Sequence, residues 1–398
     1  MTLLQGMNAA IIADGAYSVA EAIGGSRAEM RADALDLAGD DPRFSTDARE
    51  DGPSISVPVT PVDTAVSASG ALRKKQAGFG VLLERHGAIK GEYIMAMRGT
   101  MPPMFTSADW LSNYQIGMAR GPSGCPVHAG FNDIYNKMRV DVQTMIAEAR
   151  PKPVKMHFVG HSLGGALATL AALDYAKAAT GATYLYTFGA PRVGSVGIAG
   201  DIRRYIGVGN VKRVYALADP VPMIPLLPFQ HCDIGATGVN AGFGGITGDA
   251  HSMKLSYIQN MTARGWPPEV IRATKSNPKY WLEQAEKSSG FGSKMGYWAL
   301  SAALAALMPV LHLLCGGVSA TLTLADLLME GVRRSARLAL EVGDMILRFV
   351  KAALRFAVGF VDRGLEVADL TASFLNYVLD MVMARLVQAA RAAIKHIV

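Results

Sequence analysis

The pentapeptide Gly160-His-Ser-Leu-Gly164 places a serine between two glycines with the spacing G-x-S-x-G. An apolar run at 154–159 precedes it, as expected for a buried strand, and a small-residue run at 166–179 follows it, as expected for a helix. A strand that turns sharply into a helix has no room for a Cβ two residues before or after the serine. The helix would direct its N-terminal amides toward an oxyanion at Ser162. The pattern predicts that Ser162 is a nucleophile, and a glycine-rich packing turn is the alternative.

A serine nucleophile needs a base to accept its proton and an acid to orient that base. After a serine at such a turn, the acid and then the histidine are expected later in the chain. Residues 211–218 have the composition of a strand, and Asp219 follows them directly. Pro220 and Pro222 prevent helix formation and stiffen the loop that carries this carboxylate. We therefore predict Asp219 as the acid, in preference to Asp201, Asp233 and Asp249.

The base is expected among the histidines that follow Asp219. His251 comes after a glycine-rich loop at 242–248 and before the start of a helix, so its imidazole could swing over Ser162. His231, in the segment Phe-Gln-His-Cys-Asp-Ile-Gly, is the second candidate. The less suitable histidines lie in an apolar run, at the C-terminal end or beside the serine: His312, His396, His157 and His161.

The order of several short motifs resembles the class 3 lipases, a branch of the α/β-hydrolases. These motifs are Arg98-Gly-Thr100, Thr106–Tyr114, Val127-His-Ala-Gly-Phe131 with Tyr135, the serine pentapeptide, Phe188–Gly194, Asp219–Pro222 and His251-Ser-Met. They span roughly residues 79–260. The resemblance implies an α/β fold, with a mostly parallel sheet wrapped by helices and a serine-hydrolase site that acts on lipid esters.

An oxyanion hole requires hydrogen-bond donors that converge on the developing charge. The amide of Leu163, directly after the nucleophile, is expected to be one donor. Thr100 lies in the loop after an early strand, and the resemblance implies that its amide and hydroxyl supply the other donors. The alternative is that Thr100 is an ordinary turn residue.

Residues 101–111 occupy the position of the lid in class 3 lipases. The resemblance implies that Met104, Phe105 and Trp110 cover the acyl groove in water and turn outward on lipid. A packed loop and helix without a gating role is the alternative. Phe131 is expected to line the core or the wall of the groove.

The 398-residue chain carries a formal net charge of +6, and half of its residues are hydrophobic. Because no stretch combines basic and aromatic residues, nucleic acid is not an expected partner. The three cysteines show neither zinc nor disulfide spacing, and no metal or cofactor is expected. The N-terminus lacks the pattern of a signal peptide. We therefore expect a cytoplasmic or membrane-associated protein, with leaderless secretion as the alternative.

Four regions are predicted along the chain. They are an N-terminal helical and irregular wrapping segment (1–75), a class 3 lipase-like α/β-hydrolase domain (76–262), a polar connector (263–294) and a hydrophobic and amphipathic helical domain (295–398). Within the second region, 80–85 and 91–98 are expected to pair as a hairpin.

The last region begins with an unusual stretch, because residues 295–325 contain no charged side chain. Residues 296–314 alone are long enough to cross a bilayer. A helical hairpin that turns at Gly316-Gly317 and is buried in protein is the alternative. Farther on, apolar residues recur at helical spacing and a stripe of cations shares one helix face: Arg348, Lys351 and Arg355. This stripe is expected either to be the solvated face of a helical bundle or to bind a membrane or a partner.

Together these patterns predict a serine carboxylic ester hydrolase that acts on lipids. A phospholipase is favoured because the helical region could hold the enzyme on a bilayer. One alternative is an antibacterial lipase effector, delivered by a partner and neutralised by an inhibitor protein. Another is a membrane-disrupting or membrane-anchoring helical protein in which hydrolysis is secondary.

Overall fold

The computed structural model describes most of the chain outside the segment 22–54. The described ranges are 3–21, 55–56, 61–66, 75–85, 90–99, 117–178, 181–195, 197–226, 228–231, 235–239, 243, 245–261, 266–267, 277–288, 290, 293–315, 324–338, 341–360 and 364–395. The chain forms two compact units. We call residues 1–241, 247–270 and 390–398 the sheet unit, and residues 242–246 and 271–389 the helical unit.

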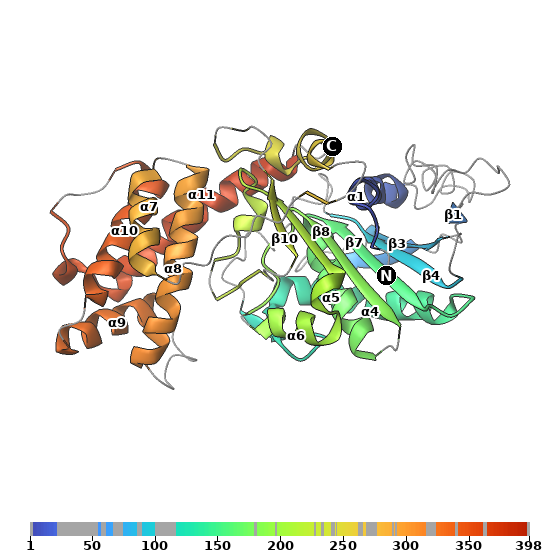
Figure 1. Cartoon of the computed structure of the whole chain (residues 1–398), viewed down its shortest axis with the longest axis horizontal. Helices are drawn as coiled ribbons and strands as arrows, with labels where there is room; N and C mark the ends of the chain where they lie inside the picture. The colour runs from blue at the N-terminus through green and yellow to red at the C-terminus, as the bar shows by residue number, and fades with distance from the viewer. Residues whose placement is uncertain are drawn as a thin grey trace. The chain divides into compact units, whose positions relative to one another are not determined.

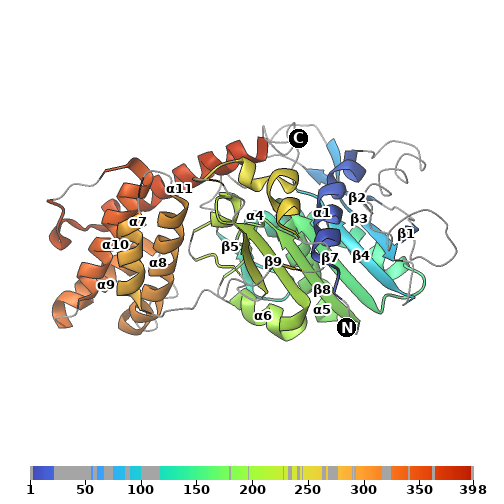
Figure 2. The same ribbon diagram turned by 45° about the horizontal axis from the view of Figure 1, so that its top comes forward.

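The sheet unit is built on eight strands, counted over the described residues. Five of them are parallel neighbours in the order β4, β7, β8, β9 and β10. Figure 2 labels the first four of these strands, and Figure 1 labels β10. Strand β3 pairs antiparallel with β4, and β1 and β2 both pair with β3. The bounds are β1 Ile55–Ser56, β2 Pro61–Val66, β3 Lys75–Arg85, β4 Glu92–Met97, β7 Lys155–His161, β8 Ala182–Phe188, β9 Val211–Ala216 and β10 Ala236–Val239. The mostly parallel sheet and the β3–β4 hairpin were both expected from the sequence, and both are confirmed.

Helices cover both faces of this sheet, which explains why its central strands are buried almost throughout. Every residue of β4 is buried, and so is every residue of β7 after Lys155. Figure 1 shows α4, α5 and α6 on one side and α1 on the other. The bounds are α1 Gly6–Glu21, α4 Ala129–Glu148, α5 Leu163–Ala178 and α6 Gly197–Tyr205. A separate short ribbon pairs β5 (Met118–Arg120) with β6 (Pro126–His128).

Asp174 of α5 links this helix to α4 through side-chain hydrogen bonds. Its carboxylate accepts hydrogen bonds from the Tyr135 hydroxyl at 2.8 Å and from two nitrogens of Arg139 at 2.7 and 2.6 Å. Because the carboxylate is only 8% exposed, its charge needs these donors to be tolerated in the interior. Tyr135, expected in the core or the groove wall, therefore belongs to the helix-packing layer.

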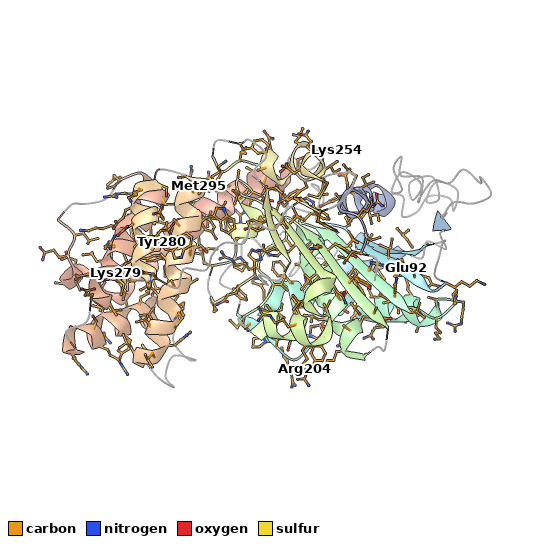
Figure 3. All side chains as sticks on the ribbon, viewed as in Figure 1. Glu92, Arg204, Lys254, Lys279, Tyr280 and Met295 are labelled. Carbon is orange, nitrogen blue, oxygen red and sulfur yellow. The ribbon has the colours of Figure 1, made fainter. Side chains whose placement is uncertain are left out.

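A second buried carboxylate lies at the start of β4. Glu92, labelled in Figure 3, accepts from His157 Nε2 at 2.9 Å, and His157 Nδ1 is 3.1 Å from the Tyr186 hydroxyl. The Tyr186 hydroxyl also accepts the Leu4 amide at 3.0 Å, and Trp266 Nε1 donates to the Leu4 carbonyl at 3.0 Å. These bonds attach the chain just before α1 to the sheet.

Part of the segment expected to be irregular forms a strand instead. Residues 61–66 pair with β3 as β2, although Pro61 opens the segment. Proline is tolerated at the first position of a strand, and the β-branched residues Val62, Thr64 and Val66 favour extended backbone. The proline and polar residues of this segment gave no sign of a short strand. The pairing with β3 stabilises that strand.

In the helical unit, α7, α8, α9 and α10 pack against one another. Tyr297 of α8 and Phe356 of α10 are fully buried, with ring centroids 6.0 Å apart. The bounds are α7 Pro278–Ser288, α8 Lys294–Cys315, α9 Leu324–Leu338, α10 Val342–Val358 and α11 Ala372–Lys395, of which α11 belongs to this unit up to residue 389.

The structure resolves part of what the sequence left open for this region. Helix α8 has the length and composition of a membrane span, but 44% of its most apolar window is buried in protein. The predicted turn at Gly316-Gly317 lies outside the described residues. Arg348, expected in a free cationic stripe, forms a bidentate ion pair with Glu286 of α7, with both distances 2.7 Å. One member of that stripe therefore joins α10 to α7.

Candidate active site

The predicted nucleophile stands at the junction of β7 and α5. Ser162 has φ of 57°, a left-handed conformation that a residue with a side chain rarely adopts. A Cβ on Gly160 would lie 2.2 Å from the Gly164 carbonyl oxygen, and one on Gly164 would lie 2.2 Å from the Met97 carbonyl oxygen. Both positions therefore require glycine for the steric reason expected from the sequence. Helix α5 begins at Leu163 rather than near residue 166, so its first turn starts directly after Ser162.

A continuous chain of hydrogen bonds joins Ser162, His251 and Asp219. The Ser162 hydroxyl is 2.9 Å from His251 Nε2, and His251 Nδ1 is 2.7 Å from Asp219 Oδ2. All three side chains are completely buried. Because the carboxylate accepts the Nδ1 proton, Nε2 carries the lone pair and accepts the serine hydroxyl. This arrangement can move a proton from the hydroxyl to the imidazole while the oxygen attacks an electrophile.

Asp219 is held by two further donors. The Val221 amide donates to Oδ1 at 2.8 Å, and the Tyr257 hydroxyl donates to Oδ2 at 2.5 Å. The Ala216 amide in turn donates to the Tyr257 oxygen at 3.1 Å. Burial and the neighbouring carboxylate raise the pKa of Tyr257 well above its usual value, so the tyrosine remains a donor. The triad acid therefore shares one oxygen between His251 and Tyr257.

Sequence reasoning missed Tyr257, although a signal was present. The residue lies in the segment 252–257, which was predicted as the helix start after His251. In the structure, Ser252 caps this segment by accepting the Leu255 amide at 3.2 Å, and Met253–Tyr257 form one wide turn of π-helix. That turn brings the tyrosine back beneath Asp219. A buried tyrosine close in sequence to a proposed catalytic histidine could have been examined as a partner of the acid.

His161, expected to be a packing residue of the elbow, links three parts of the site. Its Nε2 donates to the His251 backbone carbonyl at 2.8 Å, so its Nδ1 must accept from the Tyr17 hydroxyl, 2.9 Å away. The Gly99 amide donates to the same tyrosine oxygen. Burial and the adjacent His251 hold the pKa of His161 well below its usual value, so His161 is neutral. Nothing in the sequence identified Tyr17 of α1 as part of this network.

Of the two predicted oxyanion donors, one lies among the described residues and the other does not. Leu163 is buried at the first position of α5. Thr100 lies outside the described residues, but the residue before it touches the nucleophile. A Cβ on Gly99 would lie 3.1 Å from the Ser162 Cβ and 2.1 Å from the Tyr17 hydroxyl. Gly99 therefore lies directly beside the serine. The predicted lid residues Met104, Phe105 and Trp110 also lie outside the described residues.

Phe131 belongs to a buried aromatic cluster around His128. The His128 ring is 4.5 Å from the Phe131 ring and 5.0 Å from the Phe229 ring, measured between centroids. His128 is 1% exposed, and its Nδ1 has no hydrogen-bond partner among the described residues. Burial lowers the pKa of His128 to about 4. The cluster is an apolar wall with one neutral histidine in it.

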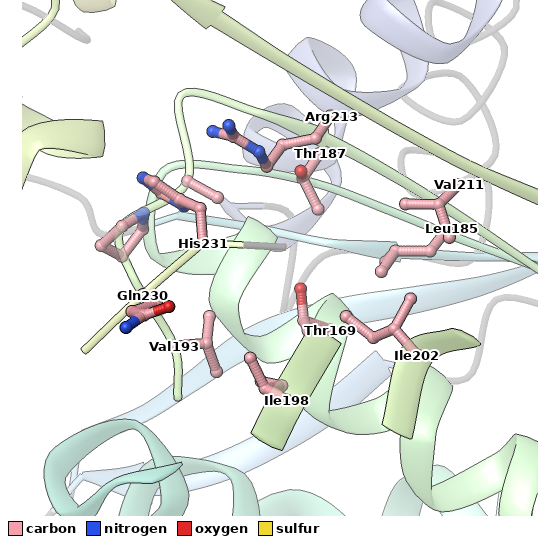
Figure 4. Close-up of a pocket in the computed structure, with 12 residues that line it drawn as sticks. Thr169, Leu185, Thr187, Val193, Ile198, Ile202, Val211, Arg213, Gln230 and His231 are labelled. Carbon is pink, nitrogen blue, oxygen red and sulfur yellow. The ribbon is translucent and has the colours of Figure 1, made fainter. Parts of the chain in front are cut away.

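His231, the second candidate for the base, does not contact Ser162. Its Nε2 is 2.6 Å from the Pro222 carbonyl oxygen, and it lines a different cavity with Arg213 (Figure 4). This cavity measures about 30 Å³, which is room for about one water molecule, and none of the triad residues lines it. Burial and the cations Arg213 and Arg192 hold the pKa of His231 well below its usual value. Of the two candidates, His251 is the one that the fold places on the serine.

No cluster of three His, Cys, Asp or Glu side chains suited to a metal ion occurs within the described ranges.

The sequence was compared with known families and proteins. Residues 94–229 match the family described as lipase (class 3). A secreted mono- and diacylglycerol lipase of Fusarium solani is 30% identical over 167 residues, covering 41% of this chain and 47% of that protein. A secreted mono- and diacylglycerol lipase of Penicillium cyclopium is 37% identical over 114 residues, covering 28% of this chain and 36% of that protein. The chain thus spans less than half the length of these relatives.

Among solved structures, the native lipase–propeptide complex of Rhizomucor miehei has a TM-score of 0.37 and 24% identity. The match covers 56% of this chain and 65% of that one. The family match includes the elbow serine and the strand that carries Asp219. The motifs lie in the expected order on a mostly parallel sheet, and the region that carries them, residues 94–229, is similar to the class 3 lipases.

Proposed function

We propose that this protein is a serine lipase that hydrolyses carboxylic esters of lipids. The observation that carries the proposal is the buried hydrogen-bond chain from Ser162 through His251 to Asp219. The match of residues 94–229 to the class 3 lipases supports a lipid ester as the substrate.

The geometry supports the following reaction. Ser162 Oγ attacks the ester carbonyl carbon as its proton passes to His251 Nε2, and Asp219 stabilises the imidazolium that forms. The carbonyl oxygen becomes an oxyanion at the first turn of α5, where the Leu163 amide and Thr100 are the proposed donors. His251 then gives its proton to the departing alcohol, which leaves an acyl-serine. A water molecule, deprotonated by the same histidine, then attacks the carbonyl carbon of the acyl-serine; His251 returns the proton to Ser162 Oγ as the C–O bond breaks, which releases the fatty acid.

A matched pair of serine variants tests the proposal. Ser162→Ala should abolish hydrolysis of p-nitrophenyl butyrate and labelling by a fluorophosphonate probe. Ser123→Ala is the control, because the Ser123 hydroxyl is also buried but has no partner among the described residues. The control should keep both properties. Labelling that persists in Ser162→Ala would assign the nucleophile to another residue.

Within lipid esters, we propose acylglycerols as the first substrate class to test. The support comes from the two relatives described as mono- and diacylglycerol lipases. Phospholipids are the second candidate, and the uncharged exposed face of α8 favours them because it suits a protein that works at a bilayer. Release of fatty acid from diacylglycerol and from phosphatidylglycerol, each measured against Ser162→Ala, separates the two classes.

The antibacterial role, with a delivery partner and an inhibitor protein, stays a proposal, as do the membrane-disrupting role and the cytoplasmic or membrane-associated location. Expression of the wild type and of Ser162→Ala in a bacterial host tests the first two. An effector that acts by hydrolysis should arrest growth through the wild type alone, whereas a membrane-disrupting protein should arrest growth through both. Fractionation of the same cells tests the location.

A further inference from the structure

Helix α8 differs from its neighbours in what it exposes. The outward positions of α10 include Asp344, Arg348, Lys351 and Arg355, as expected for a helix with one face in water. The exposed and half-exposed positions in the second half of α8 include no Asp, Glu, Lys or Arg. They are Ala305, Ala306, Met308, Pro309, Val310, His312, Leu313 and Leu314. Leu313 alone leaves 85% of its surface exposed.

The opposite face of α8 is already occupied. Leu304, Leu307 and Leu311 are buried, and Leu311 packs against Gly331 of α9, where an added Cβ would lie 2.4 Å from its Cδ2. The helix is therefore anchored in the bundle by one face. This arrangement favours a helix that lies against a surface over one that crosses a bilayer alone.

Three arginines of α9 lie near the C-terminal end of this helix. Arg334 of α9 donates from Nη1 to the carbonyl of Leu314 at 2.6 Å, which fixes α9 beside the last turn of α8. Arg333 is 65% exposed, and Arg337, one turn farther along, is also exposed. The carboxylate that faces these three arginines is Glu330, 2.6 Å from Arg334 and 3.8 Å from Arg333. Counted over α9, these three arginines stand against two carboxylates, Glu330 and Asp326, which leaves the helix with a net charge of +1.

We propose that the second half of α8 and the arginines of α9, together the α8 docking face, bind the surface of an anionic lipid bilayer. Leu313 and its apolar neighbours enter the boundary between head groups and acyl chains, while Arg333 and Arg337 contact lipid phosphates. The apolar side chains match the acyl chains of such a surface, and the neighbouring arginines match its negative charge. The inference deepens the proposed function, because it names the surface from which a lipid substrate would be drawn.

This assignment differs from the one that the sequence suggested. The stripe on α10 begins with Arg348, whose guanidinium is bound on two sides by Glu286. Lipid binding through that residue would require breaking this pair. The docking face needs no such rearrangement, since Leu313 is exposed already.

The test measures binding of the full-length protein to vesicles in a Ser162→Ala background, so that hydrolysis does not alter the lipid. Leu313→Asp should lower the partition coefficient onto vesicles of phosphatidylglycerol and phosphatidylcholine about tenfold or more. Phe360→Asp is the matched control, because Phe360 is 72% exposed in the same unit but lies outside α8. It should change binding by less than about twofold. The double variant Arg333→Gln/Arg337→Gln should lose about tenfold on the mixed vesicles and little on phosphatidylcholine alone.

Three outcomes would overturn the docking face. The first is equal loss of binding in Leu313→Asp and Phe360→Asp, and the second is no vesicle binding by the parent protein. The third is conversion of a dimer into a monomer by Leu313→Asp with vesicle binding unchanged, which would assign the face to a second copy of the chain. Leu313→Asp with Ser162 intact should hydrolyse p-nitrophenyl butyrate like the wild type. This readout separates failure of the docking face from failure of the proposed hydrolase.

Discussion

Two histidine–carboxylate pairs are buried in the sheet unit, and their bonding is nearly the same. His251 is bound to Asp219 at 2.7 Å and to a serine hydroxyl at 2.9 Å. His157 is bound to Glu92 at 2.9 Å and faces the Tyr186 hydroxyl at 3.1 Å. Both imidazoles are completely buried. In each case, hydrogen bonds thus link a hydroxyl group, an imidazole and a carboxylate in series.

The two histidine–carboxylate pairs differ in the surroundings of the hydroxyl group that each histidine faces. Ser162 has a left-handed φ of 57° and stands directly before the first turn of α5, where the oxyanion donors are proposed. The Tyr186 hydroxyl accepts the Leu4 amide, and its ring stacks on Trp266 with centroids 5.5 Å apart. The comparison teaches that a hydrogen-bonded series is not sufficient for catalysis. The hydroxyl must also stand where an ester carbonyl and oxyanion donors can meet it.

The largest expected difference comes from the same substitution at the two histidines. His251→Gln should lower kcat for p-nitrophenyl butyrate about 10³-fold or more, because an amide cannot accept the serine proton. His157→Gln should keep kcat within a few-fold, since its amide can still donate to Glu92, and should lower the free energy of unfolding by about 1–3 kcal/mol. Steady-state kinetics and urea denaturation of both variants measure this. Comparable rate losses would remove the functional distinction between the pairs.

A smaller difference is expected at the two tyrosines. Tyr257→Phe removes one donor from Asp219 and should lower kcat about tenfold with little change in KM, because the acid is oriented less firmly. Tyr186→Phe removes the partner of His157 and the acceptor of the Leu4 amide, so it should reduce stability by about 1 kcal/mol and leave kcat nearly unchanged. A purely structural role for Tyr257 would instead appear as a loss of stability with normal kcat in the folded fraction.

A change in stability alone, without a change in kcat, is expected from a buried histidine that has no carboxylate partner among the described residues. The pKa of His128 is lowered to about 4 by burial, whereas the unfolded value is near 6.5. Below pH 6.5 the unfolded chain binds a proton that the folded chain does not accept until about pH 4. The free energy of unfolding should therefore fall through this window as the pH decreases, by about 3 kcal/mol from this residue.

Urea denaturation of the wild type and of His128→Leu at pH 7, 5.5 and 4.5 tests this contribution. The variant should show the weaker pH dependence. Identical slopes would show that His128 titrates normally in the folded protein.

The sequence by itself was enough to predict the elbow, the chain order of the triad and the class of fold. Most of this information is local. Gly160 is required by a contact with Gly164, four residues later, and Asp219 follows closely on β9, although glycine at 164 is required by the approach of the Met97 carbonyl at the end of β4. Hydrophobic runs of strand length between helical segments are likewise visible in any short window of the sequence.

The tertiary structure alone decided which side chains support that site. Tyr257 bonds to a carboxylate 38 residues away, Tyr17 to a histidine 144 residues away, and Arg348 to a glutamate 62 residues away. With 13 tyrosines and 39 cations in the chain, residue type does not identify these partners. Their hydrogen bonds depend on how strands and helices far apart in sequence pack together. A local pattern can at most suggest a candidate, such as Tyr257 six residues after His251, and does not establish the contact.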